Sequence, residues 1–352
     1  MPQQETAYSL GFDRDAFITR LAKEYQIKHR RTGKNISFGA AMAERKAQAE
    51  MARDVLDSLR AGGPVGWIML KPRRCGWSTF FAILGLELAS RVGWDVGIMA
   101  HEEDSTRAIY DIAKIAYERL PSPRPELRYS RLNRLVFGTH HRATRNDSDD
   151  PGDMNSLACK TAGGHHPFSG QTIRFAHLDE VAKWPGNAKD QWQAINSVAN
   201  TMPTDGPTLM VWVSTANGSE GAFYETYLEA QKYADRPGYF AYRPHFMPWF
   251  ADEGSRMVVA PEHLKAWDEW DKEDREREAE LVARFNLSKE QLFFRRHKSQ
   301  KLGGWDFFSQ EYPATWQEAF LASGRGVFAM EHIEKQRRNT CKPVFTGEIV
   351  GI

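Results

Sequence analysis

KPRRCGWST, residues 71–79, has most of the features of a phosphate-binding loop, with one residue out of place. The usual pattern, G-x-x-x-x-G-K-[ST], carries a lysine directly after its second glycine. Here Trp77 takes that place, between Gly76 and Ser78. Three cations stand in the other arm of the segment: Lys71, Arg73 and Arg74. The sequence therefore predicts a nucleotide-binding loop in which one of these three supplies the missing charge.

The flanks of this segment predict a strand before it and a helix after it. The apolar run VGWIML (65–70) ends where the loop begins, and helical spacing of apolar residues starts near Ser78. A strand–loop–helix unit presents backbone N–H groups and the positive end of a helix to an anion. Gly76 would let a phosphate approach the backbone, and Ser78 stands where a hydroxyl binds Mg²⁺ in such loops. The competing interpretation is a strand-to-helix turn that is merely basic.

Further apolar runs alternate with helical patterns along the chain. The runs are WDVGIMA (94–100), RLVFGT (134–139), TIRFAHL (172–178) and TLMVWVS (208–214), and helical spacing extends over 40–63, 78–91 and 104–120. Near-continuous apolar strands that alternate with helices predict an α/β fold with a mainly parallel sheet covered on both faces. After residue 250 the sequence turns highly charged and helical, as in 269–285, which predicts a smaller, mostly helical subdomain.

The composition limits the class of protein. The 352 residues, 41% of them hydrophobic, are enough for a sizeable core. The net charge of +1 means that a polyanion would have to be bound by a local basic patch. Three scattered cysteines exclude a disulfide framework and a zinc ribbon and fit a reducing compartment. The beginning of the sequence has no signal-peptide core and no run is long enough to span a membrane, so we expect a cytoplasmic protein without a membrane partner.

An acidic pair follows the predicted strand 172–178. Asp179 and Glu180 stand in HLDEVAKW, at the carboxyl end of that strand. Ligands of parallel sheets bind outside the carboxyl ends of the strands. Asp179 would then hold the hydration shell of Mg²⁺, and Glu180 would orient or deprotonate the water that attacks the γ-phosphate of ATP. Alone, such a pair could equally cap the next helix, but together with the loop it predicts a nucleotide-hydrolysing site.

A third element ends the predicted strand 208–214. VWVSTANG closes in small polar residues, so that Ser214, Thr215 and Asn217 could lie beside the γ-phosphate. A loop that changes conformation when this phosphate leaves would report hydrolysis to the rest of the protein. An ordinary Ser/Thr/Asn turn after a strand is the alternative.

These elements occur in a characteristic order: a phosphate loop with a displaced lysine, HLDEVAKWP and STANG. Together with GIMAHEEDSTRAIYD, TAGGHHPFSGQTIRFAHLDEVAKWP and QEYPATWQEAFLASGRGVF, they resemble the large terminase subunit of tailed bacteriophages, the motor that packages DNA into the procapsid. The matching segments extend from about Gln48 to Phe328 and so include most of the chain.

The resemblance implies a P-loop ATPase core of the additional-strand, catalytic-glutamate type, with a lid subdomain. It makes Glu180 the catalytic glutamate. The residues it implies for Mg²⁺ are Ser78 and Asp179, and those for coupling are Ser214, Thr215 and Ala216. The residues it implies for nucleotide binding are Gln48, Lys71, Arg73, Arg74, Cys75, Gly76, Trp77, Ser78 and Thr79. The three loop cations are also candidates for a catalytic role, and Lys71 is the first choice because some terminases carry the basic residue early in the loop.

Two of these residues have roles implied separately. Arg73 matches the arginine that is common in the loop of other members. Gln48 would read the edge of the adenine, and a solvent-facing residue of its helix is the alternative.

A trans arginine finger is expected at Arg142 or Arg145, with Arg131 and Arg134 as competitors. Three lysines are weighed as DNA contacts against simple solvated charges: Lys160, Lys183 and Lys189.

The resemblance also implies partners and a domain organisation. It implies ATP and Mg²⁺ as cofactors, double-stranded DNA as the moved substrate, and a homo-oligomeric ring, usually a pentamer. The portal protein and the small terminase subunit would be partners at the portal vertex in the host cytoplasm. The expected divisions are an N-terminal helix and linker (1–34), the ATPase core (35–250), the lid (251–340) and the start of a connection (341–352). Large terminases continue into a nuclease, so we expect here the ATPase portion alone, which would not cut DNA.

Two other functions remain open at this point. The first is a nucleotide-binding module that orders a ring without turnover, in which Trp77 marks lost activity; the presence of Glu180 argues against it. The second is a helicase-like DNA-dependent ATPase with the same core, although the sequence contains no dedicated platform for stacking single-stranded bases.

Overall fold

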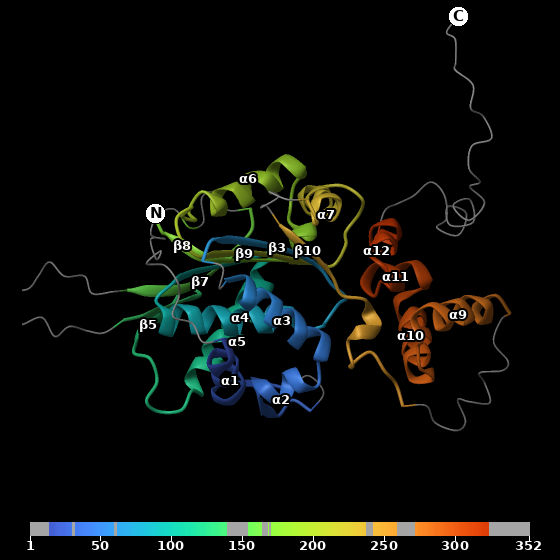
Figure 1. The fold of residues 1–352 in the computed structure, drawn as a ribbon, viewed down its shortest axis with the longest axis horizontal. Coiled ribbons are helices and arrows are strands. Elements are labelled where there is room, and N and C mark those ends of the chain that lie inside the picture. Colours follow the sequence, from blue (N-terminus) through green and yellow to red (C-terminus); the bar gives the residue numbers. More distant parts are fainter. Residues whose placement is uncertain are drawn as a thin grey trace, which may run out of the picture.

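The computed structural model describes residues 14–29, 32–59, 62–138, 154–163, 168, 170–236, 242–258 and 272–323. A twisted sheet of eight strands forms its centre (Figure 1). In spatial order the strands are β10 (Arg243–Phe246), β3 (Pro64–Leu70), β9 (Thr208–Ser214), β8 (Ile173–Asp179), β4 (Asp95–Ala100), β7 (Asn155–Thr161), β6 (Arg134–Phe137) and β5 (Leu127–Arg131). The first six are mutually parallel. β6 pairs antiparallel with β7, and β5 pairs antiparallel with β6. The prediction of a mainly parallel sheet is therefore confirmed.

Helices cover both faces of the sheet, as an alternation of strands and helices requires. On one face lie α6 (Ala188–Ala199) and α7 (Ala222–Tyr233), over a core that includes Trp212 and Tyr227. On the other lie α3 (Lys46–Leu59), α4 (Trp77–Glu87) and α5 (Glu103–Glu118). α4 is apolar on nearly every side because it is enclosed between the sheet and its neighbouring helices. It continues into a π-helical turn at Leu88–Val92.

The N-terminal part of the chain packs on the same core. α1 (Arg14–Glu24) leads into a two-stranded antiparallel sheet of β1 (Gln26–Lys28) and β2 (Asn35–Ser37). The fully buried carboxylate of Glu87 in α4 accepts a hydrogen bond from the Tyr25 hydroxyl at 2.6 Å and pairs with Arg20. This part is thus held by a buried charge network as well as by apolar packing, and the domain division at residue 34 stays a prediction.

The single helix predicted over 40–63 was wrong, because the structure has two. α2 (Phe38–Ala43) begins after the Ser37 cap, and α3 starts at Lys46 after a turn at residues 44–45. No residue at this turn strongly disfavours a helix, so packing decides against local propensity. In the turn, the Arg45 guanidinium donates to the Cys75 carbonyl oxygen, which joins it to the loop after β3.

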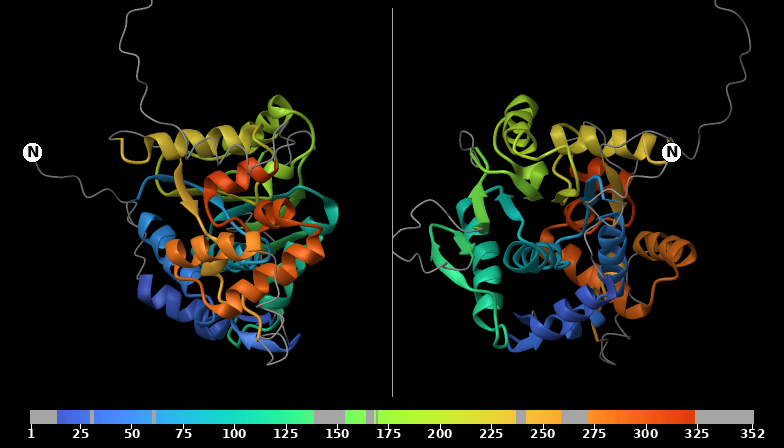
Figure 2. Two further views of the ribbon diagram at one scale, coloured as in Figure 1. Left: turned by 90° about the vertical axis from the view of Figure 1, so that its right-hand side faces the viewer. Right: turned by 60° about the vertical axis from the view of Figure 1, so that its left-hand side comes forward.

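The charged C-terminal part forms a separate small core at one end of the sheet (Figures 1 and 2). Its helices are α9 (Lys272–Phe285), α10 (Lys289–Leu302) and α11 (Trp305–Glu311). Trp249 is central to it, stacking on Phe294 with ring centroids 5.8 Å apart and meeting Phe308 edge-on. α12 (Trp316–Ser323) returns to the main core, where Phe320 packs on Tyr227. Within the described ranges, no helix combines the length and apolar character that a membrane crossing requires.

α1 and α2 approach each other so closely at Gly39 that a larger residue there should destabilise the fold. A Cβ added there would lie 2.8 Å from the Ala22 Cβ and 2.9 Å from its carbonyl oxygen. Alanine normally favours a helix over glycine by up to about 1 kcal/mol. Here we expect Gly39→Ala to lower the free energy of unfolding by about 1–3 kcal/mol, because backbone must move. Urea denaturation measures this.

Gly63→Ala is the matched control, since a Cβ there meets nothing within 4 Å. We expect Gly63→Ala to change the free energy of unfolding by no more than about 0.5 kcal/mol. Equal stability of the two variants would show that α1 and α2 are not as closely packed as described.

Candidate functional site

Three adjacent strands bring the predicted site residues to one edge of the sheet. β3, β9 and β8 are parallel neighbours, so their carboxyl ends coincide. The Lys71 N–H donates to the Ser214 carbonyl oxygen at 3.0 Å, and the Glu180 N–H donates to the Val213 carbonyl oxygen at 2.6 Å. Backbone bonds thus fix the relative positions of residues that lie more than a hundred positions apart in the sequence.

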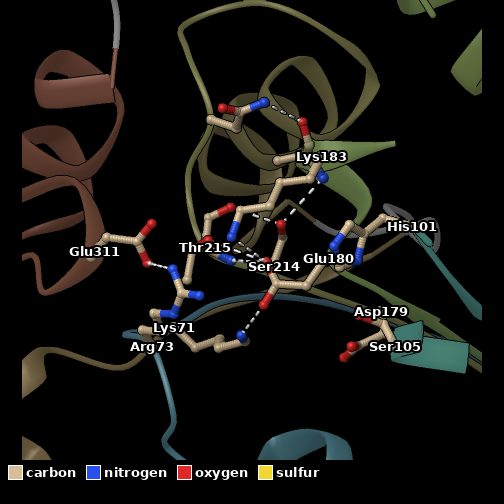
Figure 3. Close-up of polar contacts among 12 residues, drawn as sticks. Lys71, Arg73, His101, Ser105, Asp179, Glu180, Lys183, Ser214, Thr215 and Glu311 are labelled. Carbon is tan, nitrogen blue, oxygen red and sulfur yellow. Dashed lines mark hydrogen bonds and ion pairs between the residues drawn. The ribbon is translucent and has the colours of Figure 1, made fainter. Parts of the chain in front are cut away.

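Lys71 and Glu180 form an ion pair across the end of β9 (Figure 3). The two side chains are 7% and 14% exposed. The second carboxylate oxygen of Glu180 accepts bonds from the Thr215 N–H at 3.3 Å and its hydroxyl at 3.1 Å. Lys183 lies 3.2 Å from the same oxygen. Of the three loop cations, Lys71 is the one whose side chain reaches this carboxylate.

The pair keeps both groups charged in spite of burial. Burial alone would raise the pKa of Glu180, but the positive charges of Lys71 and Lys183 hold that pKa well below its usual range. Burial alone would lower the pKa of Lys71, and the Glu180 carboxylate raises it instead. Glu180 is consequently an ionised carboxylate and not a proton donor at neutral pH.

The backbone at Glu180 is strained in a way that aims its side chain. Its φ is +52°, a left-handed conformation that non-glycine residues seldom adopt. Such conformations cost free energy and cluster at functional sites, where surrounding contacts hold them. Here the strand ends at Asp179 and the chain turns at once into the short 3-10 helix Val181–Lys183. The turn directs the Glu180 carboxylate toward β9 and β3 instead of along its own strand.

Ser78 and Asp179 form the polar contact next to this pair. The Ser78 hydroxyl donates to Asp179 Oδ1 at 2.9 Å, and the buried His177 places Nε2 at 3.3 Å from the same oxygen. Trp184 Nε1 donates to the Asp179 carbonyl oxygen at 3.0 Å and fixes the turn. One hydroxyl and one carboxylate are the donor set that Mg²⁺ uses when phosphates and water complete its coordination. Among the described residues, no group of three or more His, Cys, Asp or Glu could hold a metal without such help.

The loop offers its backbone to an anion and turns two of its side chains inward. Gly76 has φ +90° and precedes the first turn of α4, whose N–H groups point out of the helix. Trp77 is 1% exposed and packs on Phe81 with ring centroids 5.7 Å apart. Cys75 is equally buried, and burial raises the pKa of its thiol to about 11. These two residues, predicted to bind nucleotide, can therefore do so only through their backbone.

A cavity of about 560 Å³ adjoins the loop. Gly76, Ser78 and Thr79 of the loop contribute to its lining. The lining also includes apolar side chains, Ile27, Ile36, Phe38 and Met42, and charged ones, among them Lys28, Glu44 and Asp252. A cavity with apolar walls and a few polar groups is the usual form of a small-molecule site.

Gln48 is a buried polar residue of the same cavity. It is 2% exposed, and within the described part of the chain its Nε2 atom has no hydrogen-bond partner. A buried amide without a partner is costly unless a ligand completes it. The expected base-reading role of Gln48 therefore fits its position, and its alternative as a solvent-facing residue was wrong.

Arg45 is a site residue that the sequence analysis missed. A Cβ on Gly76 would lie 1.9 Å from its Nη1, so the guanidinium rests against the loop backbone and fills the space a side chain would take. It lines the cavity beside Gln48. In the sequence, Arg45 is one charge among several in a helical pattern, and only the break between α2 and α3 distinguishes it.

The other two loop cations point elsewhere. Arg73 is largely exposed; its N–H donates to the Glu311 carbonyl oxygen at 2.9 Å, and its guanidinium lies 3.4 Å from the Glu311 carboxylate. Glu311 ends α11, so the loop is joined to the C-terminal helices at this point (Figure 3). Arg74 has a left-handed backbone (φ +61°) and lines the cavity. The three cations that the sequence could not separate thus lie in three different environments.

The end of β9 forms a compact hydrogen-bonded turn beside Glu180. Ser214 and Ala216 are buried, at 0% and 1% exposure, so neither side chain is open to a ligand. The Ser214 hydroxyl donates to the Thr215 carbonyl oxygen at 2.7 Å and accepts from the Ala182 N–H at 3.1 Å. Thr215 is the member of the predicted coupling motif that touches the Glu180 carboxylate, so a shift of Glu180 would be felt directly by this turn.

Two of the four candidates for the trans arginine finger belong to the described part of the chain. Arg142 and Arg145 lie outside the described residues. Their competitors Arg131 and Arg134 lie at the opposite end of the sheet from β3, on β5 and β6. Within one chain, neither competitor is part of the site around Glu180.

Comparison with known proteins finds similarity between this chain and several solved structures. No protein-family model and no curated protein matches the chain. It is similar to the ATPase domain of the large terminase of Thermus phage P74-26 (20% identity, 72% of this chain, 88% of that chain, TM-score 0.41). A mutant form of the same domain gives 21% identity over 71% and 87%, with a TM-score of 0.42. The HK97 bacteriophage large terminase gives 14% identity over 78% of this chain and 53% of that chain, with a TM-score of 0.49. At these identities the likeness concerns the fold, so the roles of individual residues have to come from the site itself.

Removal of Lys71 should leave a buried carboxylate without its main counter-charge. We expect Lys71→Ala to lower the free energy of unfolding by about 3 kcal/mol at pH 7, as when one partner of a buried pair is removed. Lys189→Ala, at an exposed lysine, should change it by less than about 0.5 kcal/mol. Urea denaturation of both variants and of the wild type measures this.

The pH dependence of that loss gives a second check. In the wild type the pKa of folded Glu180 lies below its unfolded value, so the pair contributes above the unfolded pKa of about 4.3 and the contribution fades as the pH falls. In Lys71→Ala the buried carboxylate should protonate more easily. The difference between the two proteins should therefore shrink as the pH falls from 7 toward 4. A difference that stays constant would contradict a charge-based pair.

Proposed function

We propose that this protein is an ATP-hydrolysing motor that moves double-stranded DNA during packaging of a viral genome. The observation that carries the proposal is the convergence of Lys71, Glu180 and Thr215 beside Ser78 and Asp179. These residues meet at the carboxyl ends of adjacent parallel strands, where α/β proteins bind their ligands. The motifs that resemble large terminases supply the packaging context.

The nucleotide would lie along the cavity with its two ends in different surroundings. The base would lie against the apolar side chains of the lining, within reach of the Gln48 Nε2, which has no partner among the described residues. The phosphates would lie over Gly76, against the N–H groups of the first turn of α4. Arg45 and Arg74 line the same cavity, so their charges would add to this cradle.

Each charged residue at the strand ends has a separate task. Ser78 and Asp179 would hold Mg²⁺, which when bound offsets the charge of the phosphates. Lys71 would turn from the carboxylate to the phosphates when these arrive, because a triphosphate is the stronger anion. Glu180, released from Lys71 but still ionised, would accept the proton of the attacking water or orient it. Thr215 would keep the carboxylate in place during this exchange.

The lid would respond to the nucleotide through Arg73. Its guanidinium is shared between the loop, where phosphates would attract it, and Glu311 at the end of α11. When the guanidinium turns to a phosphate, the largely buried carboxylate of Glu311 loses its ion pair. The contact that holds α11 against the loop is then weakened, so α11 can shift. The ring, its portal and small-subunit partners, and a site at the portal vertex in the host cytoplasm belong to the same proposal.

The central test is Glu180→Gln. This variant keeps the shape of the side chain but cannot act as a base, so we expect it to bind ATP at least as well as the wild type. We expect turnover to fall by roughly a hundredfold or more, the usual contribution of a general base. Equilibrium binding of a fluorescent ATP analogue and steady-state phosphate release measure the two effects.

Glu225→Gln is the matched control, at an exposed glutamate of α7, and should leave both quantities unchanged. If the wild type bound ATP without any turnover, the protein would instead be a nucleotide-binding module that orders a ring. If Glu180→Gln turned over ATP at the wild-type rate, Glu180 would not be the catalytic base.

The ion pair between Arg73 and Glu311 predicts that removing a charge from the lid strengthens ATP binding. Glu311→Gln should tighten ATP binding by about two- to fivefold, because Arg73 no longer has to leave a carboxylate, and a partly exposed ion pair has about that strength. Asp306→Asn, at an exposed acid of the same helix, should have no effect. In an Arg73→Ala background the Glu311→Gln effect should vanish. Weaker binding of Glu311→Gln in a titration with ATP would contradict this role.

A further inference from the structure

Lys183 is a second cation at the Glu180 carboxylate. Its Nζ lies 3.2 Å from Glu180 Oε2, whereas Lys71 pairs with Oε1 (Figure 3). The two lysines contact different oxygens of one carboxylate and come from different elements, Lys71 from the end of β3 and Lys183 from the turn after β8. One lysine is enough to neutralise one carboxylate, so the second is a separate feature of the site.

The local conformation of the chain places Lys183 beside Glu180. Glu180 directly precedes the 3-10 helix Val181–Lys183, and residues three apart in such a helix lie on the same side. The Lys183 N–H donates to the Glu180 carbonyl oxygen at 2.8 Å and closes this turn. The spacing of glutamate and lysine in DEVAK (179–183) therefore brings the two side chains together.

The turn that carries Lys183 is anchored to the end of β9. The Ala182 N–H donates to the Ser214 hydroxyl oxygen at 3.1 Å, and Asn217 Nδ2 donates to the Ala182 carbonyl oxygen at 3.0 Å. These contacts lie at the ends of β8 and β9, whereas Lys71 begins the phosphate loop. A nucleotide that displaces Lys71 at the loop would therefore leave Lys183 in place.

The departure of Lys71 would change the surroundings of the two Glu180 oxygens unequally. Oε1 would become open on the side of the loop. Oε2 would keep the Thr215 N–H and hydroxyl, which donate to it at 3.3 and 3.1 Å, and it would also keep Lys183. A hydrogen bond from a charged donor is roughly twice as strong as one from a neutral donor. Lys183 is therefore the strongest contact left to hold the carboxylate.

We propose that Lys183 is the positioning residue of Glu180: it holds Oε2 after Lys71 has left, so that Oε1 faces the attacking water. This inference rests on the proposed function and assigns the two lysines different tasks within it. The O–H bond of the water breaks and its proton passes to Oε1, while the water oxygen bonds to the γ-phosphorus of ATP. The bond from that phosphorus to the bridging oxygen breaks, and its electron pair stays with ADP. Lys183 takes part in none of these bonds, so it acts through the placement of Glu180.

Two other roles for this lysine fit the structure less well. A lysine that bound the phosphate backbone of DNA, or the γ-phosphate itself, would have to leave Oε2, just as Lys71 leaves Oε1. Glu180 would then lose both cations at the moment at which it has to be held. Lys183 is also only 25% exposed. The geometry therefore favours the contact to Oε2 as the one that persists.

The test is Lys183→Met, which removes the charge and keeps most of the apolar stem. Without DNA, we expect kcat and kcat/KM for ATP to fall together by about ten- to a hundredfold, as when a reacting group is misplaced. Binding of a non-hydrolysable ATP analogue should stay within about twofold of the wild type. The urea midpoint should stay close to that of the wild type, because Lys183 is partly exposed and Lys71 still pairs with Glu180 before ATP binds.

Three controls separate placement of Glu180 from a structural role. Lys183→Arg keeps a charged donor and should recover most of the lost turnover. Lys232→Met, at an exposed lysine of α7, should leave turnover unchanged. In a Glu180→Gln background, Lys183→Met should lower the residual turnover no further, since no base is left to place. A structural lysine would lower turnover in both backgrounds.

Several results would overturn the inference. Weaker binding of the analogue by Lys183→Met, in step with its loss of kcat/KM, would assign the lysine to the phosphates. Weaker binding of a DNA duplex with unchanged turnover would assign it to DNA, and a collapse of the urea midpoint would make it structural. A wild type that binds ATP without turnover would end the proposed function and this inference together. Normal turnover in both the wild type and Lys183→Met would remove this inference alone.

Discussion

The ion pair between Lys71 and Glu180 is the constraint on which the rest of the site depends. It joins the end of β3 to the end of β8 across the intervening β9, at a place where both side chains are largely buried. Neither charge could be kept there alone, because an unpaired ion in such surroundings would change its protonation state. Since Thr215 bonds the same carboxylate, three strand ends are linked through one charge pair. A ligand that competes for Lys71 therefore acts on all three at once.

The proposed role of Lys71 would also explain why tryptophan can follow the glycine of the loop. In the usual pattern the lysine comes from the first turn of the helix, which leaves that position facing the phosphates. In the proposal the cation is Lys71, the first residue after β3, which leaves position 77 free to face inward. Trp77 packs on Phe80 and Phe81 and meets His245, whose pKa burial lowers to about 4. The residue that seemed to mark a lost function thus anchors α4 under the loop.

Much of this could be read from the sequence, and the failures have physical causes. The strands buried on both faces, such as β3 and β9, are continuous apolar runs and were predicted. β5, β7 and β10 were missed, because LRYSR, NSLACKT and RPHF are too polar or too short to stand out. The acids and the serine of the site were found because motif spacing identifies them. The choice among Lys71, Arg73 and Arg74, the role of Arg45 and the contact with Glu311 depend on packing between distant segments, which spacing does not encode.

The most direct test of the central claim is a crystal structure of the protein with Mg²⁺ and a non-hydrolysable ATP analogue. The account predicts that Lys71 Nζ will have left Glu180 and will lie within hydrogen-bond distance of a terminal phosphate oxygen. It also predicts the base against Gln48 and the Glu180 carboxylate still held by Thr215. A triphosphate bound elsewhere, with Lys71 and Glu180 still paired, would contradict the account.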